Sequence, residues 1–291
     1  MLGPEAYVTD MLGGSEVAHD DHAEETVQLL NADLFGEHDA ILYYLTHAWT
    51  IARRHGPQIL EIANDEMRHF KWLAHTIVAL GGTPDLRTPS VTPTEDLAGA
   101  LKKDVEAERH AIDQYEEHED RIRQDRVRSL LRRIVADEQD HLRQFQELLN
   151  QTHGEPDRTP RAPQETEGIA DRLKAAIHAE YQQTLAYLLR SFLEDHGRQV
   201  GLDMEERSVD EMRHMGWMGR RIGALGMMPT FERVRGWNTV SGEEEEAELY
   251  RDVRTWAQEA APNLLPMIDR IQAHERYHAE TPVKDPSKAP V

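Results

Sequence analysis

The stretches Asp65-Glu66-Met67-Arg68-His69 and Asp137-Glu138-Gln139-Asp140-His141 share the pattern Asp-Glu-x-x-His. Residues three apart on a helix share a face, so each stretch directs a carboxylate and an imidazole the same way. A further glutamate precedes each motif: Glu37 lies 29 residues before the first motif's glutamate, and Glu108 lies 30 residues before the second's. Glutamates and histidines in this arrangement on four helices predict a carboxylate-bridged two-metal site inside a helical bundle.

The pattern recurs downstream as Glu180, Glu211-Met212-Arg213-His214 and Glu275-Arg276-Tyr277-His278. Both Glu37 and Glu108 are followed by Ala, Ile and Tyr at offsets of 3, 4 and 7 residues, and Glu180 keeps the tyrosine at 7. A chain of 291 residues accommodates two such copies. The sequence therefore predicts an all-α protein made of two tandem four-helix bundles.

Helical spacing of apolar residues, interrupted by Gly and Pro, gives the expected element boundaries. Helices are expected over 26–53, from the following His-Gly-Pro to about 80, 94–124 and 127–150, and again over 168–196, 200–225, 241–260 and 263–280. The corresponding organisation is an N-terminal extension over 1–25, a first bundle over 26–151, a linker over 152–167, a second bundle over 168–280 and a disordered tail over 281–291.

The connection between the second and third helices leaves the topology of the first bundle open. A parallel arrangement of these helices needs a path of about 38 Å, estimated from the helical rise. About 13 extended residues reach about 43 Å, so a crossover is feasible. An antiparallel arrangement is feasible too.

Composition excludes several classes of protein. The chain has no cysteine, which excludes disulfides, thiolate clusters and cysteine nucleophiles. Its formal charge of −21 argues against nucleic-acid binding, and although an acidic surface attracts cations, it also serves solubility. No apolar run approaches the roughly 18 residues that cross a bilayer. The N-terminus lacks the pattern of a secretion signal, so we expect a cytoplasmic protein without membrane contact.

In the first bundle, Glu66 and Glu138 are the expected bridges between the metals and hence the central catalytic ligands. The remaining ligands divide between the metals, Glu37 with His69 and Glu108 with His141. One imidazole per ion among oxygen ligands favours iron or manganese over zinc or copper. Asp65 and Asp137 are expected to accept hydrogen bonds from the histidine rings.

The tyrosines of the repeated frame, Tyr44 and Tyr115, have two interpretations. They are core rings whose hydroxyls find a partner, or catalytic residues that hydrogen-bond the ligands or donate an electron.

In the second bundle, Glu180, Glu211, His214, Glu275 and His278 fill five of six ligand positions. The sixth must come from residues 243–248, and matching Arg133-Ile134 to Arg270-Ile271 predicts Glu245. An acidic run at a helix start is also what the helix dipole attracts, so a purely structural role stays open. His274 stands where the other three motifs have aspartate.

The first half resembles the ferritin-like superfamily, and its first two helices resemble bacterioferritins. The matching residues are Val27-Gln28-Leu29-Leu30-Asn31, Tyr43-Tyr44-Leu45 after Glu37, and Asp65-Glu66-Met67-Arg68-His69. The resemblance covers about residues 25–150 clearly and 168–280 faintly. It implies two iron ions per bundle and oxidation of ferrous iron by oxygen or hydrogen peroxide.

Two departures from that family affect the prediction. Ferritin cages carry a short fifth helix, whereas both bundles here run into Pro-rich segments, so we expect a small homo-oligomer and no cage. Rubrerythrin-like peroxidases need cysteines that this chain lacks.

A haem is a further expectation from the resemblance. In bacterioferritins a methionine directly after the glutamate ligates haem between two subunits, and Met67 and Met212 hold that place. The alternative is that both methionines simply pack in the core or an interface.

The leading hypothesis is a non-haem di-iron oxidoreductase of ferroxidase or peroxide-consuming type. The alternatives are an iron storage or delivery protein, a di-manganese catalase and a metal-free helical scaffold.

Overall fold

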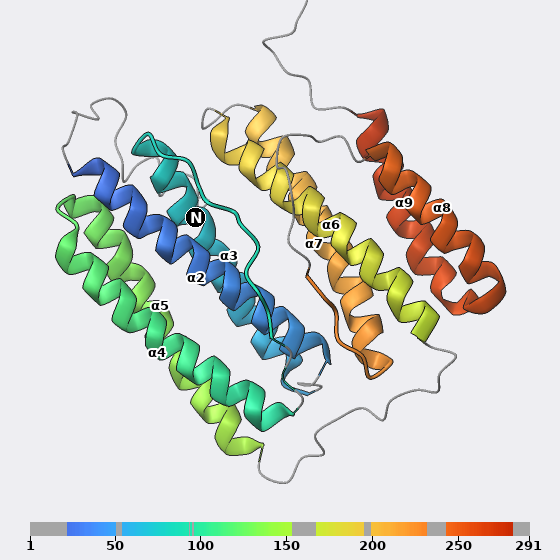
Figure 1. Ribbon diagram of the computed structural model, residues 1–291, viewed down its shortest axis with the longest axis horizontal. Coiled ribbons are helices and arrows are strands. Elements are labelled where there is room, and N and C mark those ends of the chain that lie inside the picture. The colour runs from blue at the N-terminus through green and yellow to red at the C-terminus, as the bar shows by residue number, and fades with distance from the viewer. Residues whose placement is uncertain are drawn as a thin grey trace, which may run out of the picture. The chain divides into compact units, whose positions relative to one another are not determined.

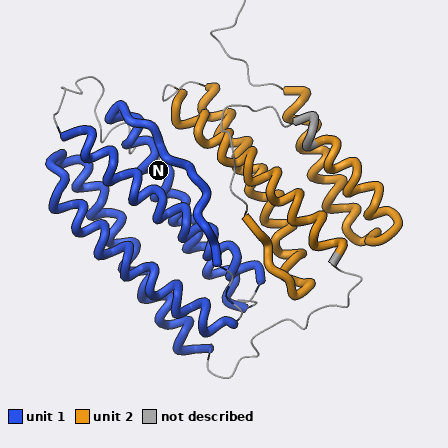
Figure 2. Tube along the Cα trace, in the orientation of Figure 1, with its two compact units in different colours: residues 1–158 blue, residues 159–291 orange. Residues whose placement is uncertain are grey.

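The computed structural model describes residues 22–50, 54–92, 94, 96–152, 167–194, 199–231 and 243–281, without the side chains of 167 and 243–246. The chain divides into two compact units, Met1–Arg158 and Thr159–Val291, which Figure 2 shows in different colours. Regular structure in the described residues is helical throughout, as expected (Figure 1). No helix among them is both long and apolar enough to cross a membrane.

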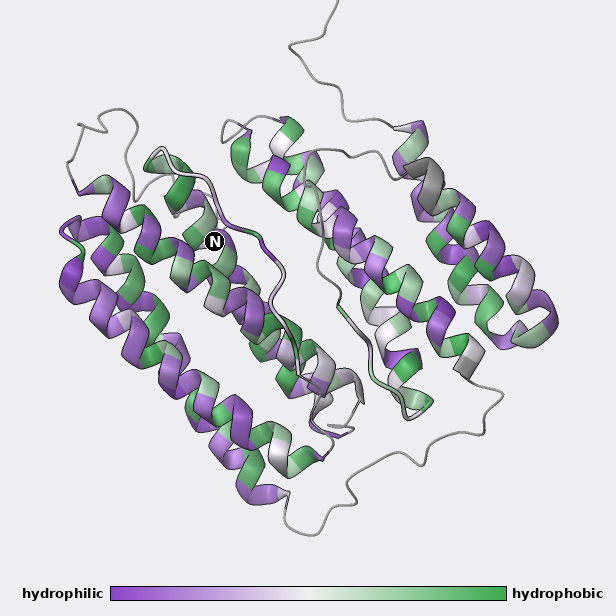
Figure 3. Ribbon diagram, viewed as in Figure 1, coloured by the Kyte–Doolittle hydropathy of each residue, from purple (hydrophilic) through white to green (hydrophobic). Residues whose placement is uncertain are grey.

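The described residues of the first unit form four long helices: α2 (Ala23–Thr50), α3 (Gly56–Ala79), α4 (Leu97–Arg121) and α5 (Asp125–Gln151). Hydrophobic and hydrophilic residues alternate along these helices (Figure 3). Tyr44, Ile59, Leu101 and Phe145 are among the buried side chains that form one core cluster of the unit. The expected helices are present, with ends that differ by a few residues.

Two helix starts follow from local chemistry. Pro57 occupies the first turn of α3, where its missing N–H needs no partner, so His55-Gly56-Pro57 begins this helix. Asp96 is the N-cap of α4, and its carboxylate accepts from the Gly99 amide at 2.6 Å. Residues 51–53, expected to end the first helix, lie outside the described part.

The first unit has the crossover topology. Contacts Thr26 to Gln124 and His47 to Asp104 show that α2 and α4 run antiparallel, so α3 and α4 are parallel. The connection follows α2: the Asn31 side chain binds the backbone of Thr83 and Asp85, and the Thr92 amide donates to the Tyr43 hydroxyl at 3.0 Å. Figure 1 shows this extended segment beside α2 and α3. The parallel alternative is therefore the observed one.

The second unit consists of α6 (Glu167–Leu193), α7 (Gln199–Ala224), α8 (Glu243–Ala260), the short 3₁₀ helix η2 (Pro262–Leu264) and α9 (Leu265–Glu280). Contacts of Glu180 with Tyr250 and of His214 with His274 join α6 to α8 and α7 to α9. The arrangement therefore repeats that of the first unit. The expected linker and tail fall almost wholly outside the described residues.

Candidate metal centres

The ligand candidates of the first unit come from all four helices and meet in its interior. Glu37 comes from α2, Glu66 and His69 from α3, Glu108 from α4, and Glu138 and His141 from α5; all are buried. Their ligand atoms form two overlapping groups. One comprises Glu37, Glu66, His69 and Glu138, and the other comprises Glu66, Glu108, Glu138 and His141. The two expected bridges, Glu66 and Glu138, are the residues common to both.

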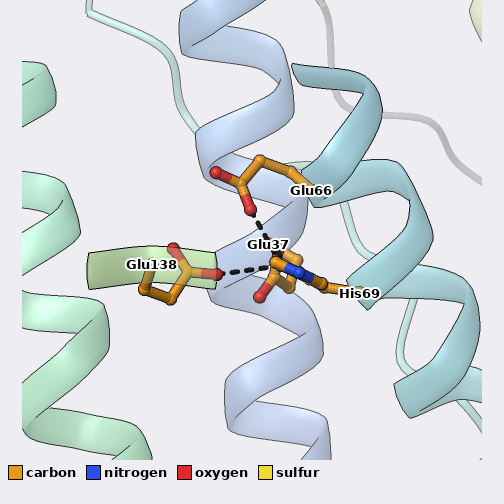
Figure 4. Close-up of side chains that lie close together, drawn as sticks. All are labelled: Glu37, Glu66, His69 and Glu138. Carbon is orange, nitrogen blue, oxygen red and sulfur yellow. Dashed lines mark hydrogen bonds and ion pairs between the residues drawn. The ribbon is translucent and has the colours of Figure 1, made fainter. Parts of the chain in front are cut away.

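Each histidine directs its Nδ1 atom at the carboxylates. His69 Nδ1 lies 2.9 Å from Glu138 Oε1 and 3.1 Å from Glu66 Oε2 (Figure 4). His141 Nδ1 lies 3.1 Å from Glu66 Oε1 and 3.6 Å from Glu138 Oε2. Each shared carboxylate thus presents one oxygen to each histidine, as a bridging ligand must.

The opposite nitrogen of each ring faces an aspartate. His69 Nε2 lies 3.3 Å from Asp137, which Arg133 also binds, and His141 Nε2 lies 3.5 Å from Asp65. A proton on Nε2 satisfies this aspartate and leaves Nδ1 with a lone pair for a metal. The aspartate before each bridging glutamate therefore serves the histidine of the other motif.

Polar pairs tie α2 to α4 along what we call the seam, defined by four contacts. Tyr44 donates to Glu108 Oε1 at 2.6 Å, and Tyr115 donates to Glu37 Oε1. Further out, His118 Nδ1 lies 2.7 Å from Asp33, and His47 Nδ1 lies 2.9 Å from Asp104. Each tyrosine thus binds the glutamate of the opposite helix.

The two outer pairs of the seam are functional candidates that the sequence prediction missed. Asp33 and Asp104 each lie four residues before a ligand glutamate, and His47 and His118 lie ten residues after one. Extending the repeated frame in both directions would have revealed this signal.

A cavity of about 370 Å³ opens in the middle of the seam. Gly36, Ala40, Ala107 and Ala111 contribute to its walls, and carboxylates of both clusters line it. Small side chains at the repeated alanine positions therefore leave a path from solvent to the ligands.

Burial and mutual repulsion control protonation of the first centre. Burial, followed by the charge of Glu66, raises the pKa of both Glu37 and Glu108 well above the ordinary value. Burial alone would lower the pKa of His141, but hydrogen bonds to Glu138 and Glu66 outweigh it and raise this pKa to about 10. Without metal the acids hold protons, or pair with imidazolium, because four buried carboxylates cannot all be charged.

The donor set fits a pair of metal ions. Glu37 Oε2 and Glu108 Oε2 are buried and make no hydrogen bond within the described residues, although the second oxygen of each carboxylate binds a tyrosine. The nearest ion-pair contacts of these oxygens are longer than a hydrogen bond, 3.6 Å from Glu37 Oε2 to His69 Nδ1 and 4.0 Å from Glu108 Oε2 to His141 Nδ1. A buried carboxylate oxygen without a hydrogen bond is costly, and a bound cation would remove that cost.

The second unit brings together Glu180, Glu211, His214 and Glu275 in one cluster. His214 Nδ1 lies 3.1 Å from Glu180, 3.2 Å from Glu211 and 3.1 Å from Glu275. His278 Nδ1 lies farther out, 3.4 Å from Glu211. Four of the predicted ligands therefore meet in one cluster, and the fifth, His278, lies beside it.

The sixth position of this centre falls on α8, where the side chain of the predicted Glu245 lies outside the described residues. Tyr250 donates to Glu180 as Tyr115 does to Glu37, so Tyr250 corresponds to Tyr115. Seven residues before it stands Glu243, at the position of Glu108. The stretch from Tyr250 to Glu275 is two residues longer than that from Tyr115 to Glu138, and the prediction had assumed equal lengths. This register favours Glu243 over Glu245.

The aspartate positions of the second unit are unequal. Asp210 lies 3.4 Å from His278 Nε2, as in the first unit. His274 Nδ1 instead lies 3.0 Å from His214 Nε2, so a neutral ring replaces a carboxylate behind this ligand.

A tryptophan packs on one ligand histidine in each unit, which the sequence prediction also missed. Ring centroids are 5.7 Å apart for His69 and Trp72, and 5.6 Å apart for His214 and Trp217. The repeated Met-Arg-His-x-x-Trp sequence was the available signal. The two methionines of this repeat, Met67 and Met212, are partly exposed, and haem binding by them stays a prediction.

Comparisons with known proteins give a family model and solved structures that resemble parts of this chain. Residues 27–155 match the family model described as "Ferritin-like domain". Among solved structures, the bacterioferritin of Desulfovibrio desulfuricans is 22% identical, with a TM-score of 0.43, over 50% of this chain and 98% of that chain. No curated protein matches the chain.

Proposed function

We propose, on the premise that residues 27–155 are a ferritin-like domain, that the first unit binds two ferrous ions and oxidises them with dioxygen or hydrogen peroxide. The observation that carries this proposal is the sharing of Glu66 and Glu138 by two overlapping clusters. Two carboxylates placed between two ions offset their repulsion, which separate single-metal sites would not require. Oxygen donors with one imidazole per ion suit iron or manganese.

The chain's own groups divide the work. Glu66 and Glu138 would hold both ions, while Asp137 and Asp65 keep each histidine's Nδ1 directed inward. Tyr44 and Tyr115 orient the terminal glutamates, which leaves one oxygen of each for a metal. Two bound ferrous ions supply two electrons, which with two protons reduce dioxygen to hydrogen peroxide, or hydrogen peroxide to two waters.

We extend the proposal to the second unit, with Glu180, Glu211, His214, Glu275 and His278 as ligands. Glu243 completes this set by its register with Tyr250. A small homo-oligomer in the cytoplasm remains our expectation for the assembled protein.

Ferrous oxidation by the metal-free chain tests the proposed activity. Stopped-flow absorbance and an oxygen electrode should show oxidation faster than in buffer, and Glu66→Ala should lose the two metal ions of the first unit. Glu61→Ala, an exposed change on the same helix, should retain them.

Several results would contradict the proposal. If Glu66→Ala kept both metal ions of the first unit, the ligand assignment would be wrong. Oxidation at the buffer rate with iron bound would remove the ferroxidase activity. Manganese in the protein as purified would favour the catalase alternative, and a hollow particle in light scattering would favour storage.

A further inference from the structure

A second cavity, of about 590 Å³, lies between α8 and α9 in the second unit. Its lining includes the arginines Arg251, Arg254 and Arg276, together with Glu275 of the candidate metal cluster. Arg254 is paired with Asp269 at 2.6 Å. Within the described part of the chain, Arg251 and Arg276 have no carboxylate partner in the recorded ion pairs. The cavity therefore combines unneutralised positive charge with a volume typical of small-molecule sites.

The internal repeat shows what is particular to this cavity. In the first unit Arg132 binds Glu119 at 2.6 Å, and in the second Arg254 binds Asp269 at 2.6 Å. The same two positions form an ion pair in both units, but the acidic and the basic residue have exchanged places. This match agrees with the correspondence of Tyr250 to Tyr115, so positions in the two hairpins can be compared one by one.

Two of these positions explain the space. Ile112 and Leu142 in the first unit correspond to Ala247 and Ala279 in the second, and both alanines line the cavity. Alanine at both positions leaves fewer side-chain atoms than the isoleucine and leucine of the first unit. The cavity is therefore a local departure from the duplicated pattern.

The same comparison explains the charge. Glu116, Glu119 and Gln139 correspond to Arg251, Arg254 and Arg276, so two acids and an amide have become three guanidinium groups. Arg132 has become Asp269 in the opposite direction. Arginine binds carboxylate and phosphate oxygens through two parallel N–H groups, and a cluster of arginines beside a cavity suits an anionic ligand.

The cavity also reaches the second metal cluster. The Glu275 side chain is 12% exposed, whereas its counterpart Glu138 is 3% exposed. A molecule in the cavity would lie beside Glu275 with its charged group on the arginines. We propose that this cavity binds a small organic anion, through a carboxylate or phosphate group, next to the second cluster. The first unit has no equivalent arginines at these positions.

Calorimetric titration of the full-length, metal-free chain tests this binding without anions coordinating metal. Inorganic phosphate and succinate are the two probes, and the tighter one identifies the group recognised. Changing Arg251→Gln and Arg276→Gln together should weaken binding about 10-fold or more, the effect of losing a charge-assisted hydrogen bond. Changing the exposed Arg123→Gln and Arg126→Gln in the first unit removes the same charge and should leave affinity unchanged.

A second variant tests the space independently of the charge. Ala247→Ile with Ala279→Leu restores the side chains of the first unit and should abolish binding while the helix content stays the same. Failure of both probes to bind at millimolar concentration would overturn the proposal. Equal weakening by the control pair, or native affinity in the filled variant, would overturn it too. None of these outcomes depends on ferrous oxidation in the first unit.

Discussion

Asp137 has no direct place among the ligands, yet it determines which nitrogen of His69 faces the cluster. Asp137→Asn weakens that orientation, and we expect metal affinity in the first unit to fall about 10- to 100-fold. Competition with a chelator of known affinity measures this change. Asp140→Asn is the control, because Asp140 contacts Arg143 and Gln144 and no ligand histidine. Equal losses in both variants would show that the effect is general charge removal.

Protonation of His141 gives the metal-free protein a pH dependence. Its pKa is about 10 in the folded state and 6.5 when unperturbed. A raised pKa contributes stability that is complete below pH 6.5 and disappears as pH rises through about 10. The raised pKa of Glu37 acts with the same sign. We expect the melting temperature of metal-free protein to fall between pH 7 and pH 10.

Metal-loaded protein is the control for this pH prediction. A bound cation replaces the protons at the same carboxylates, so its melting temperature should vary less over the same range. Equal profiles for loaded and metal-free protein would show that other groups dominate.

Two glycines in the helices of the first unit differ in the space around them. Gly36 is inside α2, and a Cβ there would meet nothing within 4 Å; Gly56 starts α3, and a Cβ there would lie 2.7 Å from the Ala48 carbonyl oxygen. Gly36→Ala should stabilise the first unit by about 0.5–1 kcal/mol, because the unfolded chain has less conformational entropy with alanine than with glycine. Gly56→Ala should destabilise it, because the helix must shift. Urea unfolding followed by circular dichroism compares the two, and stabilisation by Gly56→Ala would contradict the close approach.

Element positions were predictable because apolar spacing and Gly-Pro punctuation are local signals. The all-α fold is confirmed, and the ligand positions converge because the three-residue spacing of each motif is also local. The direction of α4 was not predictable, because the connection is long enough for either topology. The sixth ligand of the second unit stays a prediction: Glu245 assumes stretches of equal length in the two units, whereas the register of Tyr250 favours Glu243. Asp33 and His118 lie outside the repeated Ala, Ile and Tyr frame, so their signal becomes visible only where that frame is extended in both directions.

At the scale of the whole chain, the two candidate metal centres are unequal. Asp137 supports His69, whereas the ring of His274 stands behind His214. We therefore expect the first unit to bind iron more tightly, so that limiting iron fills it first. Anomalous diffraction from crystals soaked below one iron per site would show the order. His274→Asp should reduce the difference in iron affinity between the two units. Stronger anomalous density among α6, α7 and α9 in the native chain would contradict the predicted order of filling.

The seam also has a consequence for how the first bundle assembles. Its contacts join residues 57 to 85 positions apart, so they depend on how the two helix hairpins of the unit dock. If the two hairpins docked one helical turn out of place, the partners of the seam would be displaced by about 5.4 Å. Every buried acid of the seam would then lose its hydrogen-bond partner at the same time. The four pairs therefore favour one register of docking between α2 and α4. A bundle docked in another register is therefore destabilised as a whole. The pairs near both ends of α2 and α4 thus fix the distance between Glu37 and Glu108.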